Sequence, residues 1–356
     1  MGWFWSNDKD KDKKKKKDGK EDSPIIKITH DDASTNRGFQ IDTSNMASED
    51  QERGVDAYVS SYHNVTIFEK DDLAKVKKEL AEEKNITLLE KIGSGHYAEV
   101  YRGHNTYTGR DVAIKIIILT STNLRYQEVN LPQEIECLQK LQHRRIIRLY
   151  MIFQTDNKVV MVMGYAERGT LGDLIQQKGA LRELACWALF REVFYAVKYM
   201  HQNSYAHRDI KLENILITRG MVPKLCDFSF TVKWDGKTPS HQWCGSLPYF
   251  APELLRMQPY NPLKVDIWAF GVCLFIMAND KEPFKCGKAE EEKQMLSAQL
   301  EKKWTLRSRT EKKYSPNYKD LLDRMLEPDL DRRITVNGMV KHPWITTDLS
   351  PGPNRT

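Results

Sequence analysis

The sequence predicts an α+β fold in two parts, with a small strand-rich part followed by a larger helical part. Short apolar runs with strand character recur between residues 86 and 165, and one helical stretch interrupts them. After about Gly169 the pattern changes to long amphipathic stretches with helical spacing. This segregation of strands and helices along the chain is typical of α+β proteins rather than of alternating α/β folds.

The expected elements of the two parts follow in chain order. Five strands read ITLLEKI from Ile86, AEVYRG from Ala98, VAIKIII from Val112, LYMIF from Leu149 and VVMVMGY from Val159. Helices of the second part are expected over residues 183–201, 264–277 and 318–326. The longest apolar run, Trp268 to Ala278, is shorter than the ~18 residues that a membrane-spanning helix needs. We therefore predict that it forms a buried core helix.

Segments outside the two parts have a different composition. Residues 1–70 are charged and hold few large apolar side chains, which is typical of a disordered extension. Residues 71–85 follow an Asp start signal and carry Leu73, Val76 and Leu80 at helical spacing, which predicts a short lead-in helix. We expect this helix to pack on the strand-rich part rather than to bind a partner. A tail with Pro and Ser, residues 346–356, follows the last helix.

Charge and cysteine usage limit the class of protein. The chain carries 55 Lys and Arg against 49 Asp and Glu, a formal net charge of +6, and much of this imbalance lies in scattered lysines. This charge does not by itself predict nucleic-acid binding. The six cysteines form no C-x-x-C pair, which indicates a reduced, cytoplasmic protein rather than a disulfide framework. We expect no secretory signal, because the amino terminus is aromatic and then charged, and a monomer is the default.

The stretch HRDIKLEN, from His207 to Asn214, carries the most specific chemistry. It places the carboxylate of Asp209, the ammonium of Lys211 and the amide of Asn214 in one short loop. Phosphoryl transfer to a hydroxyl needs these three groups, because the acid orients the hydroxyl and accepts its proton, the cation neutralises the migrating group, and the amide oxygen binds a metal. The tripeptide HRD arises often by chance, so the signal depends on the ordered motifs on either side.

Upstream of this loop, a glycine-rich segment and a lysine predict a phosphate site. Gly93 and Gly95 let backbone N–H groups close over phosphates, and Val100 can cover an adenine ring. A G-x-G pattern alone is more often an ordinary hairpin. It gains weight here because Lys115, in VAIK, follows at the spacing of the next strands, and Glu134 on the intervening helix is its natural ion-pair partner.

Downstream, Asp227 in the segment CDFS predicts a second metal ligand. By itself this residue fits a turn equally well. Asp227 and Asn214 are the oxygen donors that a Mg²⁺ site with nucleotide phosphates and water requires. Ser246, in CGSLPYFAPE, is expected near Asp209 and Lys211.

Together, these motifs resemble those of eukaryotic protein kinases, over residues 86–345. Finer features resemble the testis-specific serine/threonine kinases of the calcium/calmodulin-kinase group; these are LPQEIECL, the Tyr97-Ala98 pair in the glycine loop, AHRDIKLEN, DFSF, CGSLPYFAPELL and LLEPDLDRRIT. The resemblance implies a two-lobed protein kinase fold, with a β-rich N-lobe over about 86–166 and a helical C-lobe over about 167–345. It also implies ATP and Mg²⁺ as cofactors, protein substrates with Ser or Thr acceptors, and a role in spermatogenesis.

Further residue roles come from the same resemblance. The remaining residues of an ATP site are Ala113, Met163, Gly164, Ala166 and Leu216. Glu213 joins Ser246 in substrate positioning. Glu253 and Arg333 form a buried ion pair, and Asp266 braces the catalytic loop from a buried helix. A lysine two residues after the catalytic aspartate fits serine and threonine acceptors better than tyrosine.

Several positions depart from the general kinase pattern. Ala98 and Ser229 do so, but members of the resembled family share them and are active. Gly164 replaces the usual hinge acid, so the hinge is expected to be more flexible while its backbone still binds adenine. Kinases that favour upstream basic residues carry acids at three positions, which read Thr170, Glu213 and Ile276 here. We therefore expect at most a mild preference for an upstream arginine.

Gln242 stands where the family usually has a phosphorylatable threonine. Arg208 is then expected to lack its customary phosphate partner. Two alternatives follow, namely activation without a phosphate, or activation through a phosphate on Thr238 or Ser240.

Two functions remain open from the sequence. The first is an active serine/threonine kinase, because every residue expected to contact the transferred group is present. The second is an ATP-binding pseudokinase that acts as a scaffold, which the departures at Ala98, Gly164, Ser229 and Gln242 would allow. We favour the enzyme, since none of these departures removes a catalytic side chain.

The amino terminus, MGWFWS, also fits the loose form of a myristoylation site, and Lys13–Lys17 would add attraction to anionic lipid. Peripheral membrane attachment through this segment is less favoured than a solubilising tail, because Trp3 is bulky and Asp residues interleave with the lysines.

Overall fold

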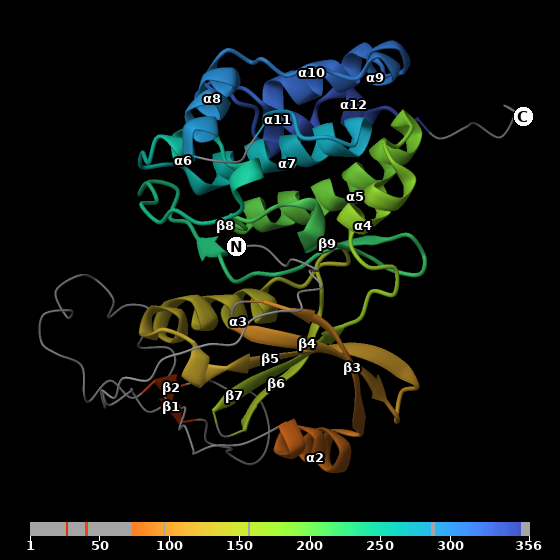
Figure 1. Cartoon of the computed structure of the whole chain (residues 1–356), viewed down its shortest axis with the longest axis vertical. Coiled ribbons are helices and arrows are strands. Elements are labelled where there is room, and N and C mark those ends of the chain that lie inside the picture. The colour runs from red at the N-terminus through yellow and green to blue at the C-terminus, as the bar shows by residue number, and fades with distance from the viewer. Residues whose placement is uncertain are drawn as a thin grey trace, which may run out of the picture. The chain divides into compact units, whose positions relative to one another are not determined.

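The computed structural model describes residues 73–349 apart from 96, 156 and 286–288, together with two short strands, β1 (Ile26–Lys27) and β2 (Gln40–Ile41), which pair antiparallel. The predictions for the charged extension, the acylation site and residues 350–356 otherwise lie outside the described residues. The described chain forms two compact units. The strand-rich unit holds residues 73–136 and 149–165, and the helical unit holds residues 137–148 and 166–349 (Figure 1).

Five antiparallel strands make the sheet of the strand-rich unit. They are β3 (Ile86–Ser94), β4 (Ala98–Asn105), β5 (Arg110–Ile118), β6 (Leu149–Thr155) and β7 (Lys158–Gly164), in the order β3-β4-β5-β7-β6. A tight turn joins β4 to β5, and Gly109 adopts a φ of +65° there, which glycine accepts without strain. β5 lies at the centre, so its residues are buried from Ile114 to Ile117. The predicted strand segments all appear in this sheet.

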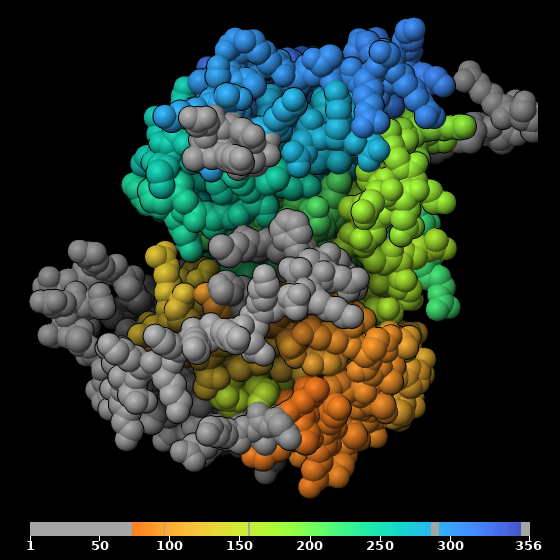
Figure 2. All heavy atoms as spheres, viewed as in Figure 1, coloured from red at the N-terminus to blue at the C-terminus, as the bar shows by residue number. Residues whose placement is uncertain are grey.

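Helix α2 (Leu73–Lys84) covers one face of this sheet. Val76 and Leu80 are completely buried in the apolar cluster that the sheet contributes, which holds Ile86, Val112, Ile114, Ile116, Phe153, Val160 and Val162. In Figure 2 the helix, in orange, forms part of the outer surface of the unit. The 12-residue helix is therefore a packed part of the strand-rich unit, because its apolar stripe faces the sheet while its lysines and glutamates face solvent.

A short helical segment separates β5 from β6. It consists of the 3₁₀ turn Leu119–Ser121, the π-helix Tyr126–Asn130 and α3 (Leu131–Lys140). Residues 137–148, which we expected in the strand-rich part, group with the helical unit instead. The reason is a pair of backbone hydrogen bonds to Leu225, each 2.8 Å long. The N–H of Ile147 donates to the carbonyl of Leu225, and the N–H of Leu225 donates to the carbonyl of Arg145.

The helical unit is built around α7 (Pro262–Asn279). The other helices are α4 (Leu171–Lys178), α5 (Glu183–Gln202), α6 (Pro252–Leu255), α8 (Ala289–Leu300), α9 (Ser308–Lys313), α10 (Pro316–Met325), α11 (Val336–Val340) and α12 (Pro343–Thr346). Phe190 on α5 stacks on Phe270 of α7, with ring centroids 4.0 Å apart, and it also contacts the ring of Trp344. Two small antiparallel pairs complete the unit, β8 (Tyr205–Ala206) with β11 (Val232–Lys233), and β9 (Ile215–Ile217) with β10 (Pro223–Leu225).

Within the described part of the chain, α7 is the one helix long and apolar enough to cross a membrane by length and composition. Nearly all of its residues are buried among the other helices of the unit, including Trp268 and Phe270. The prediction of a buried core helix for this apolar run is confirmed.

We predict that Leu80→Ala lowers the free energy of unfolding of the strand-rich unit by about 2–5 kcal/mol, because it leaves a cavity between α2 and the sheet without weakening helix propensity. The matched control is Glu82→Ala, two residues along on the exposed side of α2. Thermal and urea unfolding of both variants would measure the effect. Equal stability of Leu80→Ala and wild type would show that α2 contributes nothing to this core.

Candidate active site

One buried carboxylate organises the loop between β8 and β9 in the helical unit. Asp266 on α7 accepts the backbone N–H groups of His207 and Arg208 at 2.8 and 2.7 Å, one on each oxygen. The same carboxylate lies 2.9 Å from Nε2 of the buried His201. Arg208 adopts a φ of +64°, which non-glycine residues seldom do, and the Asp266 contact holds it there. The start of the loop is therefore fixed, and Asp209 follows directly.

The predicted catalytic side chains converge on Asp209. Lys211 Nζ and Asn214 Nδ2 donate to Oδ2 of Asp209 at 2.8 and 2.9 Å. The hydroxyl of Ser246 donates to Oδ1 of Asp209 at 2.9 Å, and Lys211 Nζ donates to the same hydroxyl oxygen at 2.9 Å. Asp209, Lys211 and Asn214 are 4, 2 and 0% exposed. In so shielded a site, hydrogen bonds to charged groups are stronger than on the surface.

The amide of Asn214 leaves one oxygen available. Its Nδ2 donates both to the backbone carbonyl and to Oδ2 of Asp209, each at 2.9 Å, and this fixes which end of the amide faces the loop. Oδ1 is buried and has no hydrogen-bond partner within the described residues. A buried oxygen without a partner is costly unless a ligand satisfies it. The position therefore suits a cation.

Asp227 comes close to Asn214 through the backbone. The N–H of Cys226 donates to the carbonyl of Asn214 at 2.9 Å, and Asp227 follows with a φ of +60°. Ser229 donates to Oδ1 of Asp227 at 2.5 Å. In the described ranges, no group of three or more His, Cys, Asp or Glu side chains is arranged to hold a metal. One amide and one carboxylate fit Mg²⁺ when phosphate oxygens and water complete its shell.

The strand-rich unit contains the other predicted charged pair. Lys115 Nζ, on β5, donates to Oε1 of Glu134, on α3, at 2.5 Å, and both side chains are almost completely buried. Lys115 lies opposite Val100 of β4 in the sheet register. Gly93 also pairs with Val100, and the N–H of Gly95 donates to the carbonyl of Ala98 at 2.7 Å, which closes the turn between β3 and β4.

The residues predicted to bind adenine divide between the two units. In the strand-rich unit, Ala113 lies opposite Met163, and Gly164 lies opposite Val112 as the last residue of β7. In the helical unit, Ala166 is buried and Leu216 forms a β-bridge with Thr170. Gly164 is thus part of the sheet as the last residue of β7 that pairs with β5.

Comparison with known proteins agrees with this geometry. Residues 86–345 match the family described as the protein kinase domain. The chain belongs to the protein kinase family. Testis-specific serine/threonine-protein kinase 2 of Mus musculus is 34% identical over 281 residues, which cover 77% of this chain and 76% of the relative. Testis-specific serine/threonine-protein kinase 1 of Homo sapiens is 34% identical over 290 residues, or 80% of this chain and 76% of the relative.

A third relative, maternal embryonic leucine zipper kinase of Xenopus tropicalis, is 36% identical over 267 residues, which cover 74% of this chain and 39% of the relative. The resemblance to testis-specific serine/threonine kinases and the two-lobed protein kinase fold are confirmed. The chain is a protein serine/threonine kinase.

A third buried ion pair joins Arg333 and Glu253 in the helical unit. Arg333 donates from Nη1 and Nη2 to the two oxygens of Glu253, at 2.7 and 3.0 Å. Its Nε donates to the carbonyl of Glu327, Nη1 donates to that of Lys264, and its guanidinium lies 5.0 Å from the ring of Trp268. The bidentate pair therefore ties α6 to α7 and to the segment before α11.

Two residues near the catalytic loop have contacts that sequence reasoning missed. Thr170 caps the first turn of α4 through a capping box with Asp173, so its hydroxyl serves the helix rather than a substrate. The pattern T-x-x-D was the available signal. Tyr249 donates from its phenol to Glu213 at 3.4 Å. Burial raises the pKa of Tyr249 well above its ordinary value, and nearby Cys273 and Glu213 raise it further, so the phenol keeps its proton.

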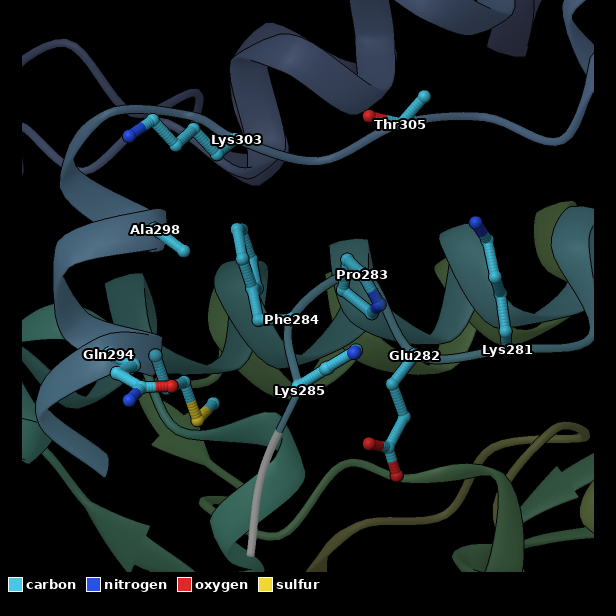
Figure 3. A pocket seen from close by; sticks show the side chains of 10 residues that line it. Lys281, Glu282, Pro283, Phe284, Lys285, Gln294, Ala298, Lys303 and Thr305 are labelled. Carbon is cyan, nitrogen blue, oxygen red and sulfur yellow. The ribbon is translucent and has the colours of Figure 1, made fainter. Parts of the chain in front are cut away.

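A hollow of about 520 Å³ lies elsewhere in the helical unit, between residues 281–285, α8 and residues 303–305 (Figure 3). Apolar and basic side chains line it together, among them Phe284, Met295, Lys281, Lys285 and Lys303. Burial, and then the negative charge of Glu213, raise the pKa of Glu282 on its wall. None of the predicted site residues lines this hollow, although the charge of Glu213 acts on Glu282 in its wall.

Arg333→Met is predicted to lower the free energy of unfolding of the kinase by about 3–5 kcal/mol, because it leaves the buried Glu253 carboxylate without its partner. Arg332→Met, the same substitution at the exposed neighbour, is the control and should change stability little. Chemical denaturation followed by circular dichroism would measure both. A cost for Arg333→Met no larger than that of the control would contradict the structural role.

Proposed function

We propose that the kinase transfers the terminal phosphoryl group of ATP, with Mg²⁺, to a Ser or Thr hydroxyl of a protein substrate, with Asp209 as the base. The observation that carries this proposal is the contact between Asp209 and the Ser246 hydroxyl at 2.9 Å. This contact is an internal instance of the hydrogen bond that a substrate alcohol must make with a general base.

Each of the site residues has a separate role in this proposed reaction. Asp209 orients the acceptor hydroxyl and takes its proton, while Lys211, bonded to the same carboxylate, brings positive charge to the side where negative charge develops. Asn214 and Asp227 would hold the metal, which supplies positive charge to the phosphate oxygens when bound. Lys115, kept in place by Glu134, contributes a cation for phosphates, and the Gly93–Gly95 turn supplies backbone N–H groups.

Substrate choice is proposed to depend on few contacts. Of the three positions that select upstream basic residues, Glu213 keeps a carboxylate, whereas Thr170 is committed to capping α4. A mild preference for an upstream arginine is therefore retained, and a strong dependence on several arginines in a peptide library would oppose it. From the names of its testis-specific relatives we propose a role in male germ cells. A monomeric state and a cytoplasmic location remain proposals that rest on the sequence alone.

We predict that Asp209→Asn lowers the rate of phosphorylation of a generic protein substrate by about 10²-fold or more, because the base is removed while the shape is kept. Asp331→Asn, at an exposed position, is the control and should retain activity. The measurement is incorporation of labelled phosphate with Mg²⁺ and ATP. Equal incorporation by Asp209→Asn and wild type would indicate a contaminating kinase and favour the scaffold function.

We also predict that Asn214→Ala raises the Mg²⁺ concentration needed for half-maximal activity by about tenfold or more, because it removes an oxygen ligand. Its control is Asn337→Ala, which lies exposed on α11. Initial rates measured over a Mg²⁺ titration at saturating ATP separate this effect from a simple loss of rate. An unchanged half-saturating Mg²⁺ concentration would count against Asn214 as a ligand.

A further inference from the structure

Arg208, the residue before the proposed base, is buried and makes three side-chain hydrogen bonds. Nε donates to the carbonyl of Phe230 at 2.6 Å, Nη1 to the hydroxyl of Ser240 at 3.4 Å, and Nη2 to Oε1 of Gln242 at 3.0 Å. A buried guanidinium needs acceptors, and all three here are uncharged. The Gln242 amide is therefore an acceptor for Arg208 at the position where the resembled kinases usually carry a phosphorylatable threonine.

The segment that carries Gln242 is anchored a second time, at Tyr260. The phenol of Tyr260 donates to the carbonyl of Gln242 at 2.5 Å, and the backbones of Tyr260 and Ser240 exchange two hydrogen bonds at 2.8 and 3.0 Å. Tyr260 is 1% exposed and lies just before α7, the helix of Asp266. Gln242 is thus held on one side by Arg208 and on the other by the base of α7.

Beyond Gln242, the same segment reaches the catalytic residues within four positions. Gly245 has a φ of +107°, and a Cβ there would lie 2.7 Å from the carbonyl of Arg208, so segment and loop are in close contact. Ser246 then bonds both Asp209 and Lys211. Because only four positions separate Gln242 from Ser246, fixing Gln242 restricts where the Ser246 hydroxyl can contact Asp209.

We propose that Gln242 is a positioning residue, which docks segment 230–246 on Arg208 in the unphosphorylated chain and so sets Ser246 against Asp209. This inference rests on the proposed phosphotransfer. Of the alternatives that the sequence left open, it takes activation without a phosphate over a phosphate on Ser240, whose hydroxyl also contacts Arg208 at 3.4 Å, and the phosphatase experiment below decides between these two. Thr238 does not contact Arg208 in the described contacts, since its hydroxyl donates to Asp235 at 2.5 Å within a local turn.

The test uses the full chain made together with a phosphatase, with the absence of phosphate verified by mass spectrometry. The dephosphorylated wild type should retain its initial rate. Gln242→Leu should lower kcat/KM for a protein substrate about tenfold, because a hydrogen bond to a charged group is lost. Gln242→Glu should keep kcat/KM at or above the wild-type value, because a carboxylate accepts a hydrogen bond from Arg208 more strongly than an amide does. Gln258→Leu, the same change at an exposed position, is the control.

Gln242→Thr provides a second arm. Its short side chain cannot reach Arg208, so activity should fall as in Gln242→Leu while the ATP-induced rise in Tm remains. Phosphatase sensitivity of the wild type, or full activity of Gln242→Leu, would overturn the inference. Wild type that is inactive whether it is made with or without the phosphatase would instead overturn the proposed function, so the two failures are distinguishable.

Discussion

The carboxylate of Asp266 connects the apolar core of the helical unit to its chemistry. It is placed by α7, whose burial among the surrounding helices fixes the helix axis. Through two backbone N–H groups it sets the start of the catalytic loop, and the strained Arg208 lies between this contact and Asp209. Arg208 then meets Gln242, and Ser246 meets Asp209. A shift of α7 would therefore disturb each of these contacts in turn.

The buried ion pairs of this kinase fix the geometry of their side chains more than they stabilise the fold. The pairs Lys115–Glu134, Asp209–Lys211 and Glu253–Arg333 are each almost completely buried. Taking such groups out of water costs several kcal/mol per ion, and the attraction between the paired charges offsets roughly this free energy. What each pair provides is a fixed geometry, because a buried charge tolerates few arrangements that keep it paired. The first two hold groups proposed for phosphate and hydroxyl, and the third ties three elements together.

Contiguous motifs made much of the site predictable. Asp209, Lys211 and Asn214 are five residues apart at most, so their loop brings them together by local geometry. The five strands and the core helix followed from apolar patterning. The contacts of Gln242 and Tyr249, and the grouping of residues 137–148 with the helical unit, were not predicted. Each depends on partners roughly 30 to 80 residues away, such as Arg208 and Leu225, whose approach is set by tertiary packing rather than by local sequence.

The most direct test of this account is to follow the terminal phosphoryl group itself. Purified kinase would be incubated with ATP labelled at that group and a generic protein substrate, and the labelled residues separated after acid hydrolysis. The account predicts label on serine and threonine that disappears when Mg²⁺ is chelated. Substrate that remains unlabelled, or label that persists without a divalent cation, would contradict it.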